Sequence, residues 1–311
     1  MNGRQQPTVL CVGAADMDLL LSMRALPAPG TEAVEDNRFD YAAGGGAAEA
    51  ALTIARLGGR AALCARVGAD IHGRRLLHLY EDSGVDVRGV TLDRRAPTGF
   101  RTILREDSGA RRALVYPGAN LNLSTADAER AAADIRPDAA YLQVDGVPDA
   151  AIGASRLFAA DGLPVFLDAC RAPEGAPLSA FARAEIFLTD ADCAYRLTGT
   201  RPAGSDSCLK ASMALEKTAR ARYYVTYIGD RGFHIYDGRY CHMVSGYGRM
   251  TASEPPEGGL CAALILRYLE GGDILAACRF ALGFAELMKS NRADPGYFPT
   301  AADIDAYIDR N

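Results

Sequence analysis

The chain has 311 residues, of which 49% are apolar, and it carries a formal net charge of −5. This length and apolar fraction are sufficient for a large buried core. Charges of both signs are interspersed, which argues against nucleic acid or an anionic membrane as the main partner. The longest apolar runs are too short to span a bilayer.

The cysteines and the first residues indicate the compartment. Eight cysteines are scattered without a Cys-x-x-Cys pair, and the four histidines have no ligand spacing. This distribution suits reduced, mostly buried thiols better than a disulfide framework or a zinc site, so we assign no metal ligands. The polar segment before the first strand has no signal-peptide pattern. We therefore expect a cytoplasmic protein.

Short β-rich runs alternate with longer helical patterns along most of the chain. Such alternation predicts an α/β fold, with right-handed crossovers and a mostly parallel sheet covered by helices on both faces. In chain order, the expected strands are 9–12, 61–65, 140–144, 165–168, 186–188 and 223–228, and the expected helices are 47–57, 74–83, 126–135, 150–160 and 208–218, with a helical region after Leu260.

Two stretches, 19–41 and 98–116, break this rhythm because polar and apolar residues alternate in them with period two. This alternation is typical of strands with one face in water. We expect a small separate sheet that covers a site, and the alternative is an edge extension of the large sheet.

A run of three glycines, Gly44, Gly45 and Gly46, precedes the helix expected at 47–57. Glycines let a ligand approach the backbone closely, and the free amides of a helix start offer it hydrogen bonds. Glu49 in the first turn would point a carboxylate at the same space. A flexible turn before a core helix gives the same pattern, so this signal is weak by itself.

Other polar residues follow expected strands. Asp16 and Asp18 come directly after the first strand, where ligands bind in open α/β sheets, and paired carboxylates suit sugar hydroxyls. The alternative is a pair of loop or capping aspartates. Asn120, Asp145 and the Gly229–Gly232 turn are ordinary turn residues unless they lie near the others.

Taken in order, these pieces resemble the ribokinase-like (PfkB) family of carbohydrate kinases over nearly the whole chain. The first strand is similar to the family's opening strand, with Asp18 at its sugar-binding aspartate, and 44–58 resembles the first family signature. Further motifs follow in the family's order: Pro-x-Pro-Gly at 27–30, Val67-Gly68-Ala69-Asp70, Ser83-Gly84-Val85, Thr98-Gly99, Gly118-Ala119-Asn120, Leu197-Thr198-Gly199 and Pro299-Thr300.

The resemblance implies a ribokinase-like three-layer α/β/α domain over 8–305, with lid strands inserted at about 19–43 and 97–117. Family members transfer the γ-phosphoryl group of ATP, with Mg²⁺, to a hydroxyl of a sugar held under the lid, and in some of them the lid mediates a homodimer. On this chain, the substrate residues would be Asp16, Asp18, Gly44, Gly45, Gly46, Glu49, Asn120 and Asp145, and the nucleotide residues Asp190, Gly229 and Gly232.

The catalytic motif departs from the family. The family's catalytic base is an aspartate that ends a Gly-Ala-Gly-Asp run. Alignment back from Cys261 places that aspartate at Gly258, and the three residues before it are Pro255, Pro256 and Glu257. Proline has no N–H to donate, and Glu257 adds negative charge where the phosphate would lie. Losing the base alone typically costs on the order of 10²–10⁴-fold in rate.

The nucleotide half departs further from the family. Residues 190–193 stand where the family has an Asn-x-x-Glu pattern, and Cys193 takes the place of the acid that is associated with magnesium. In the sugar half, Glu49 replaces an asparagine, Gly46 replaces a lysine of some members, and Asp145 replaces a glutamate. The sugar half therefore matches the family's residues more closely than the nucleotide half does.

We expect a carbohydrate-kinase homologue that binds a sugar or nucleoside and whose phosphotransfer is weak or lost, in other words a pseudokinase. ATP and Mg²⁺ are its cofactors only if activity remains. One alternative is an active kinase that uses a displaced acid, Glu254 or Glu257, as its catalytic residue. Another is a protein that interacts with partners through the lid and has no ligand.

Overall fold

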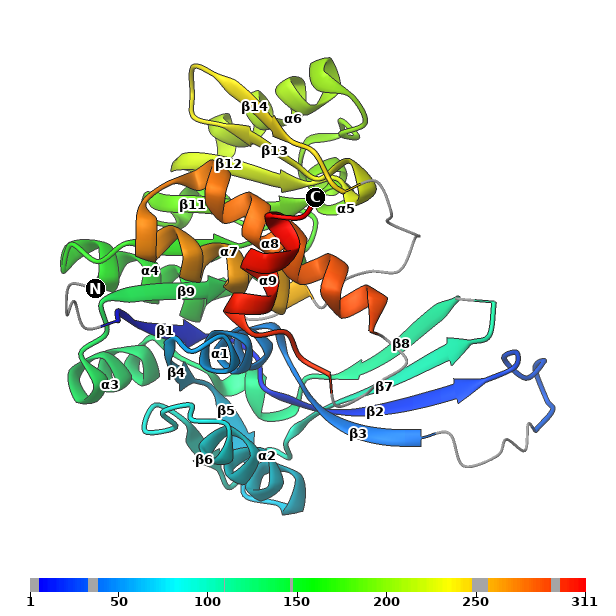
Figure 1. The fold of residues 1–311 in the computed structure, drawn as a ribbon. Coiled ribbons are helices and arrows are strands. Elements are labelled where there is room, and N and C mark those ends of the chain that lie inside the picture. Colours follow the sequence, from blue (N-terminus) through cyan, green and yellow to red (C-terminus); the bar gives the residue numbers. More distant parts are fainter. Residues whose placement is uncertain (1–5, 33–38, 109, 146–147, 248–256, 292–296) are drawn as a thin grey trace.

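A mostly parallel sheet runs through the centre of this computed structural model, which describes residues 6–32, 39–108, 110–145, 148–247, 257–291 and 297–311 (Figure 1). Its strand order is β14-β13-β12-β11-β10-β9-β1-β4. Neighbours from β12 to β4 pair in parallel, and β13 and β14 add antiparallel pairs at one edge. The strands are β1 (Thr8–Val12), β4 (Arg60–Cys64), β9 (Ala139–Gln143), β10 (Val165–Asp168), β11 (Ala184–Asp190), β12 (Ala221–Tyr227), β13 (Phe233–Tyr236) and β14 (Cys241–Val244).

Helices cover both faces of this sheet. Because side chains alternate along a strand, Cys11 and Tyr141 pack into one core, whereas Leu10 and Leu142 pack into the other. The first core contains residues of α1 (Gly46–Arg56), α2 (Ile71–Asp82), α7 (Glu257–Gly271), α8 (Ile274–Ser290) and α9 (Ala301–Ile308), and the second contains residues of α3 (Thr125–Ile135), α4 (Pro148–Ala160), α5 (Ala191–Thr198) and α6 (Ser205–Thr218). The predicted three-layer α/β/α architecture is confirmed.

A second, smaller sheet projects from the main body (Figure 1). It has the order β3-β2-β7-β8, and a short parallel pair, β5 (Arg66–Gly68) and β6 (Thr91–Asp93), lies apart from it. The separate small sheet is confirmed, and an edge extension of the large sheet is wrong. The strands of this lid sheet are β2 (Asp16–Met23), β3 (Phe39–Gly44), β7 (Gly99–Glu106) and β8 (Arg111–Tyr116).

The lid sheet begins at Asp16 rather than at about 19, so Asp16 and Asp18 are strand residues and not loop residues. The reason is pairing on both sides: Asp16 lies opposite Gly44 of β3 and opposite Gly99 of β7. These ladder hydrogen bonds extend β2 back almost to β1. Both aspartates are therefore held at the junction of the two sheets.

The cysteines and the helices bear on the expected compartment. All eight cysteines lie within the described residues, and none forms a disulfide. Most of them are buried, as their scattered spacing predicts. In the described part of the chain, no helix has the length and apolar content that crossing a membrane requires.

Candidate functional site

Asp18 is held by an arginine at the junction of the two sheets. Arg101 of β7 lies opposite Asp18 of β2, and both are almost fully buried, with 3% and 4% of their surface exposed. Arg101 Nε donates to Asp18 Oδ1 at 2.7 Å, and Nη2 donates to Oδ2 at 2.6 Å. Nη2 also donates to Glu49 Oε1 at 3.0 Å. This bidentate, charge-assisted pair occupies both oxygens of Asp18.

Asp16 completes the carboxylate cluster. Asn120 Nδ2 donates to Asp16 Oδ1 at 2.6 Å, and Arg101 Nε lies 3.8 Å from Asp16 Oδ2. Burial raises the pKa of Asp16 to about 6, although the charge of Arg101 acts to lower it. The structure thus brings together four of the predicted substrate residues, Asp16, Asp18, Glu49 and Asn120, around an arginine that sequence reasoning missed.

The glycine loop wraps closely around this cluster. A Cβ atom on Gly44 would lie 2.1 Å from Asp18 Oδ1 and 2.4 Å from Arg101 Nη2. Gly45 has φ = 89°, and a Cβ there would lie 2.4 Å from the carbonyl oxygen of Ala14. Glycine is therefore needed at both positions because the chain's own atoms fill the adjacent space.

Gln143 holds the other side of the loop. Its Oε1 accepts from Ala47 N at 3.0 Å, so an amide at the start of α1 already has a partner. Its Nε2 donates to Asp145 Oδ2 at 2.6 Å and would lie 2.6 Å from a Cβ on Gly46. The last two predicted substrate residues, Gly46 and Asp145, thus meet at Gln143. The only sequence signal for Gln143 is a polar residue that ends an apolar strand.

The predicted base position lies inside a helix contact. Gly258 is buried in the first turn of α7, where this helix packs on α1. A Cβ on Gly258 would lie 2.6 Å from the carbonyl oxygen of Gly46 and 3.0 Å from Glu49 Cβ. The position has no side chain, and a Cβ there would require α7 or the Gly46 carbonyl to shift. The predictions on Glu254, Pro255 and Pro256 lie outside the described residues, and the side chain of Glu257 is not described.

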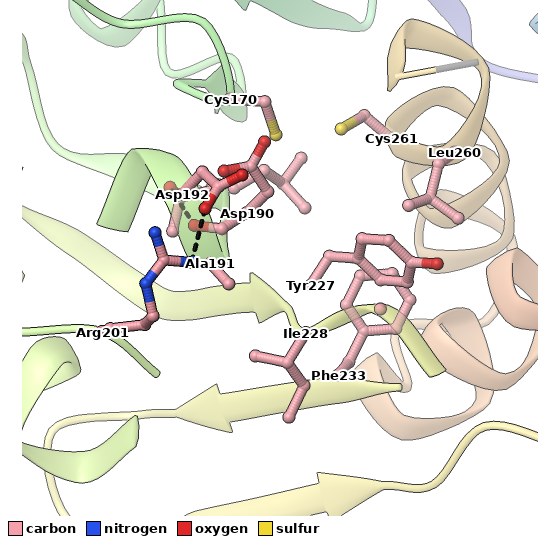
Figure 2. Close-up of a pocket in the computed structure, with 13 residues that line it drawn as sticks. Cys170, Asp190, Ala191, Asp192, Arg201, Tyr227, Ile228, Phe233, Leu260 and Cys261 are labelled. Carbon is pink, nitrogen blue, oxygen red and sulfur yellow. Dashed lines mark hydrogen bonds and ion pairs between the residues drawn. The ribbon is translucent and has the colours of Figure 1, made fainter. Parts of the chain in front are cut away.

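A pocket of about 310 Å³ lies on the predicted nucleotide side, at the carboxyl ends of β10, β11 and β12 (Figure 2). Its walls include Leu188, Tyr227, Phe233 and Leu260 together with polar residues. Ligands of open α/β sheets bind at this edge, and a few polar groups in an apolar pocket are typical of small-molecule sites.

The three predicted nucleotide residues have different places. Asp190 and Gly229 line the pocket, and Asp190 Oδ1 also caps α5 by accepting from Cys193 N at 2.6 Å. Gly232, although described, is outside the pocket lining, and a Cβ there would lie 2.0 Å from the carbonyl oxygen of Val244. The positive φ of 90° and the close approach of β14 therefore account for this glycine without a nucleotide.

Cys193 does not fit a magnesium site. The side chain is fully buried, its thiol donates to the carbonyl oxygen of Ala169 at 2.7 Å, and burial raises its pKa. Magnesium prefers hard oxygen ligands, which a neutral buried thiol cannot supply. The carboxylate of neighbouring Asp192 is exposed and pairs with Arg201 at 2.6 Å.

A family model and several known proteins match this chain. A family model described as "pfkB family carbohydrate kinase" matches residues 6–245. Ribokinase of Mus musculus is 26% identical over 208 residues, which cover 67% of this chain and 64% of that protein. Deoxyribokinase of Salmonella typhi is 22% identical over 306 residues, which cover 97% of this chain and 99% of that protein.

Solved structures share the fold. The structure of Arabidopsis thaliana ribokinase complexed with ribose and ATP superposes with a TM-score of 0.81 at 21% identity, covering 98% of this chain and 99% of that one. This similarity agrees with the central parallel sheet, the helices on its two faces and the separate lid sheet. The family match covers most of the chain. The chain therefore belongs to the pfkB family of carbohydrate kinases.

Proposed function

We propose that this protein binds a sugar- or nucleoside-like small molecule and transfers phosphate weakly or not at all. One observation carries the proposal: the base position is Gly258, where a Cβ would come within 2.6 Å of the Gly46 carbonyl oxygen. General-base catalysis needs a side chain that reaches the substrate hydroxyl, and phosphoryl transfer needs positioned donors. Gly258 has no carboxylate, and a side chain there would require its neighbours to shift.

The substrate side supports a polar ligand. Glu49 and Asp145 are the partly exposed acids of the cluster, whereas Asp16 and Asp18 are buried. Each carboxylate oxygen accepts more than one hydrogen bond, so ligand hydroxyls would share oxygens that Arg101 and Gln143 already contact. A polyol fits these acceptors better than an anion.

The nucleotide side supports a pocket but not a magnesium site. If phosphotransfer remains, ATP and Mg²⁺ are its cofactors, and the pocket with Asp190 and Gly229 is where the nucleotide would bind. The apolar walls suit a base or another flat group. Cys193 supplies no oxygen for the ion. We also propose a cytoplasmic setting, which the free cysteines support.

Calorimetric and thermal-shift titrations with ribose, deoxyribose, fructose and nucleosides, each with and without Mg-ATP, test this proposal. A ligand at about 100 times its Kd stabilises the folded state by about 2.7 kcal/mol, which raises the melting temperature. We expect a shift with one sugar or nucleoside and no phosphorylated product. Tight Mg-ATP binding followed by rapid phosphorylation of any sugar would refute the proposal.

The competing function is an active kinase with a displaced acid. It requires that Glu254→Gln or Glu257→Gln abolishes turnover in a phosphotransfer assay. Unchanged turnover in both variants removes these two residues as candidates.

We also propose a homodimer that forms through the lid sheet. Three exposed apolar residues of the lid strand β8 support it: Leu114, Val115 and Tyr116.

A further inference from the structure

Three side chains with metal-binding atoms meet at one end of the pocket. Asp168 ends β10, Cys170 follows two residues later, and Cys261 lies in α7. One carboxylate oxygen and the two sulfur atoms all lie within 4.8 Å of one another. In Figure 2 the sulfur atom of Cys261 points toward Cys170, and both sulfur atoms lie at the same end of the pocket.

The three ligand atoms lie close enough together for one thiophilic cation. Tetrahedral zinc has Zn–S distances of about 2.3 Å and Zn–O distances of about 2.0–2.2 Å, so its ligand atoms are roughly 3.6–3.8 Å apart. The 4.8 Å limit within which the three atoms lie includes these values. Two thiolates select zinc over magnesium or calcium, which prefer oxygen ligands. The family's magnesium chemistry therefore does not explain this cluster.

The carboxylate of Asp168 is already oriented. The hydroxyl of Tyr141 donates to Asp168 Oδ2 at 2.5 Å, and the backbone amide of Cys170 donates to Oδ1 at 3.0 Å. Hydrogen bonds of this kind hold ligating carboxylates in place around protein metal ions. Tyr141 and Asp168 are both buried, so the orientation is maintained away from solvent.

We propose that Asp168, Cys170 and Cys261 form a zinc site whose fourth coordination position is open to the pocket. Cys170 and Cys261 both line that pocket, so water or an anionic group of a bound ligand would complete the tetrahedron on the pocket side. The site depends neither on phosphotransfer nor on the sugar side. The chain spacing of the cysteines gives no indication of it, because the contact joins a strand end to a distant helix.

Cobalt titration of the full chain tests the proposal. The protein is purified under reducing conditions, freed of metal with a chelator and titrated with Co²⁺, and the thiolate-to-cobalt charge-transfer absorbance is recorded. We expect one equivalent of Co²⁺ per chain and loss of the band when Zn²⁺ is added. Cys170→Ser and Cys261→Ser should each remove most of the band. Cys208→Ser, a buried cysteine of α6 outside the cluster, should keep it.

Tyr141→Phe provides a second test that leaves all three ligands in place. Loss of its hydrogen bond to Asp168 should weaken Zn²⁺ affinity by roughly 10–100-fold while the cobalt band is retained. This comparison also applies if a serine variant fails to fold, which circular dichroism would reveal.

Three results would overturn the site. The wild-type protein could show no charge-transfer band, or the band could persist in both the Cys170→Ser and Cys261→Ser variants. The third result is an intact mass lighter by two hydrogens under native conditions that moves to the reduced mass with a thiol reductant. If that mass difference is absent from both the Cys170→Ser and Cys261→Ser variants, these two cysteines form a disulfide instead.

Discussion

Arg101 determines how the carboxylate cluster can be used. Its guanidinium bonds to Asp18 and Glu49 and lies 3.8 Å from Asp16, with almost no contact with solvent. Removing one partner of a buried ion pair is costly because the other charge remains without compensation. The same hydrogen bonds make Arg101 a competitor of any sugar hydroxyl that approaches Asp18.

Arg101→Leu should lower the free energy of unfolding by about 3–5 kcal/mol, because Asp18 would remain buried without its cation. Urea denaturation at neutral pH measures the change. The matched control is Arg88→Leu, which removes an exposed pair with Asp86 and should lower the free energy of unfolding far less, because solvent screens that pair. Equal losses of unfolding free energy in the two variants would show that the buried Arg101–Asp18 pair stabilises the protein no more than the exposed pair does.

Asp16 should make stability depend on pH. Its pKa of about 6 in the folded protein is above the value of about 3.9 in the unfolded chain, so the folded state holds the proton more tightly. The contribution of Asp16 to stability therefore falls as pH rises from about 4 to about 6, and its ionised form is destabilising above that range.

Asp16→Asn removes this titration and keeps an oxygen that accepts from Asn120. At pH 7.5 the variant should be more stable than the wild-type protein by about 1–3 kcal/mol, and the difference should shrink toward zero near pH 4. Urea denaturation of both proteins at pH 4, 6 and 7.5 gives the comparison. A difference that does not vary with pH would contradict the role of burial at Asp16.

At the scale of elements, periodicity predicted most of the fold. The strand at 165–168 has the predicted bounds, and the period-two stretches form the lid sheet. Local pattern could not predict the start of β2, because it depends on pairing with β3 and β7. Alternation from Gly99 through Arg101 to Ile103 does put the arginine on the inner face of β7, but its partner depends on strand register.

The contact between α1 and α7 shows the same limit of local reasoning. The sequence places the family's base at Gly258, but only the packed helices show how closely Gly46 and Glu49 approach that position. Likewise, Cys170 and Cys261 meet only after β10 and α7 have packed together. Contacts between distant segments depend on tertiary packing, so the composition of one segment does not reveal them.

Gly258→Ala should destabilise the protein by about 1–3 kcal/mol, because the added methyl group forces α7 away from the Gly46 carbonyl. Gly271→Ala, at the other end of the same helix, is the matched control, since nothing lies within 4 Å of its Cβ. That variant should be neutral or slightly more stable. Thermal unfolding compares the two, and equal melting temperatures would mean that Gly258 has room for a side chain.

At the scale of the whole molecule, the acid cluster beside the lid and the pocket at the ends of β10, β11 and β12 differ in chemistry. The lid side has its acids tied to Arg101 and Asn120, whereas the pocket side combines apolar walls and two thiols with charged residues such as Asp190. The lid sheet also presents the edge strand β8, which is exposed along its length and carries apolar side chains. Exposed apolar edge strands are sites of association between chains.

In the proposed lid-mediated homodimer, Leu114→Asp should shift the protein toward monomer, because Leu114 is 69% exposed on β8 and a charge there opposes apolar contact. Light scattering coupled to size-exclusion chromatography gives the mass in solution. Leu121→Asp, at an exposed position outside the lid strands, should leave the dimer intact. A monomeric wild-type protein at high concentration would exclude pairing through the lid.

The loss of phosphotransfer is tested most directly by measuring transfer of labelled γ-phosphate from Mg-ATP to ribose, deoxyribose, fructose and nucleosides by the full chain. Kinases typically turn over at about 1–100 s⁻¹, and a missing base lowers that rate by about 10²–10⁴-fold. Because Gly258 has no carboxylate and a Cβ there would lie 2.6 Å from the Gly46 carbonyl oxygen, we predict a rate at least about 10²-fold below that of an ordinary kinase for every acceptor. Sustained turnover at an ordinary kinase rate with any of these acceptors would contradict the account.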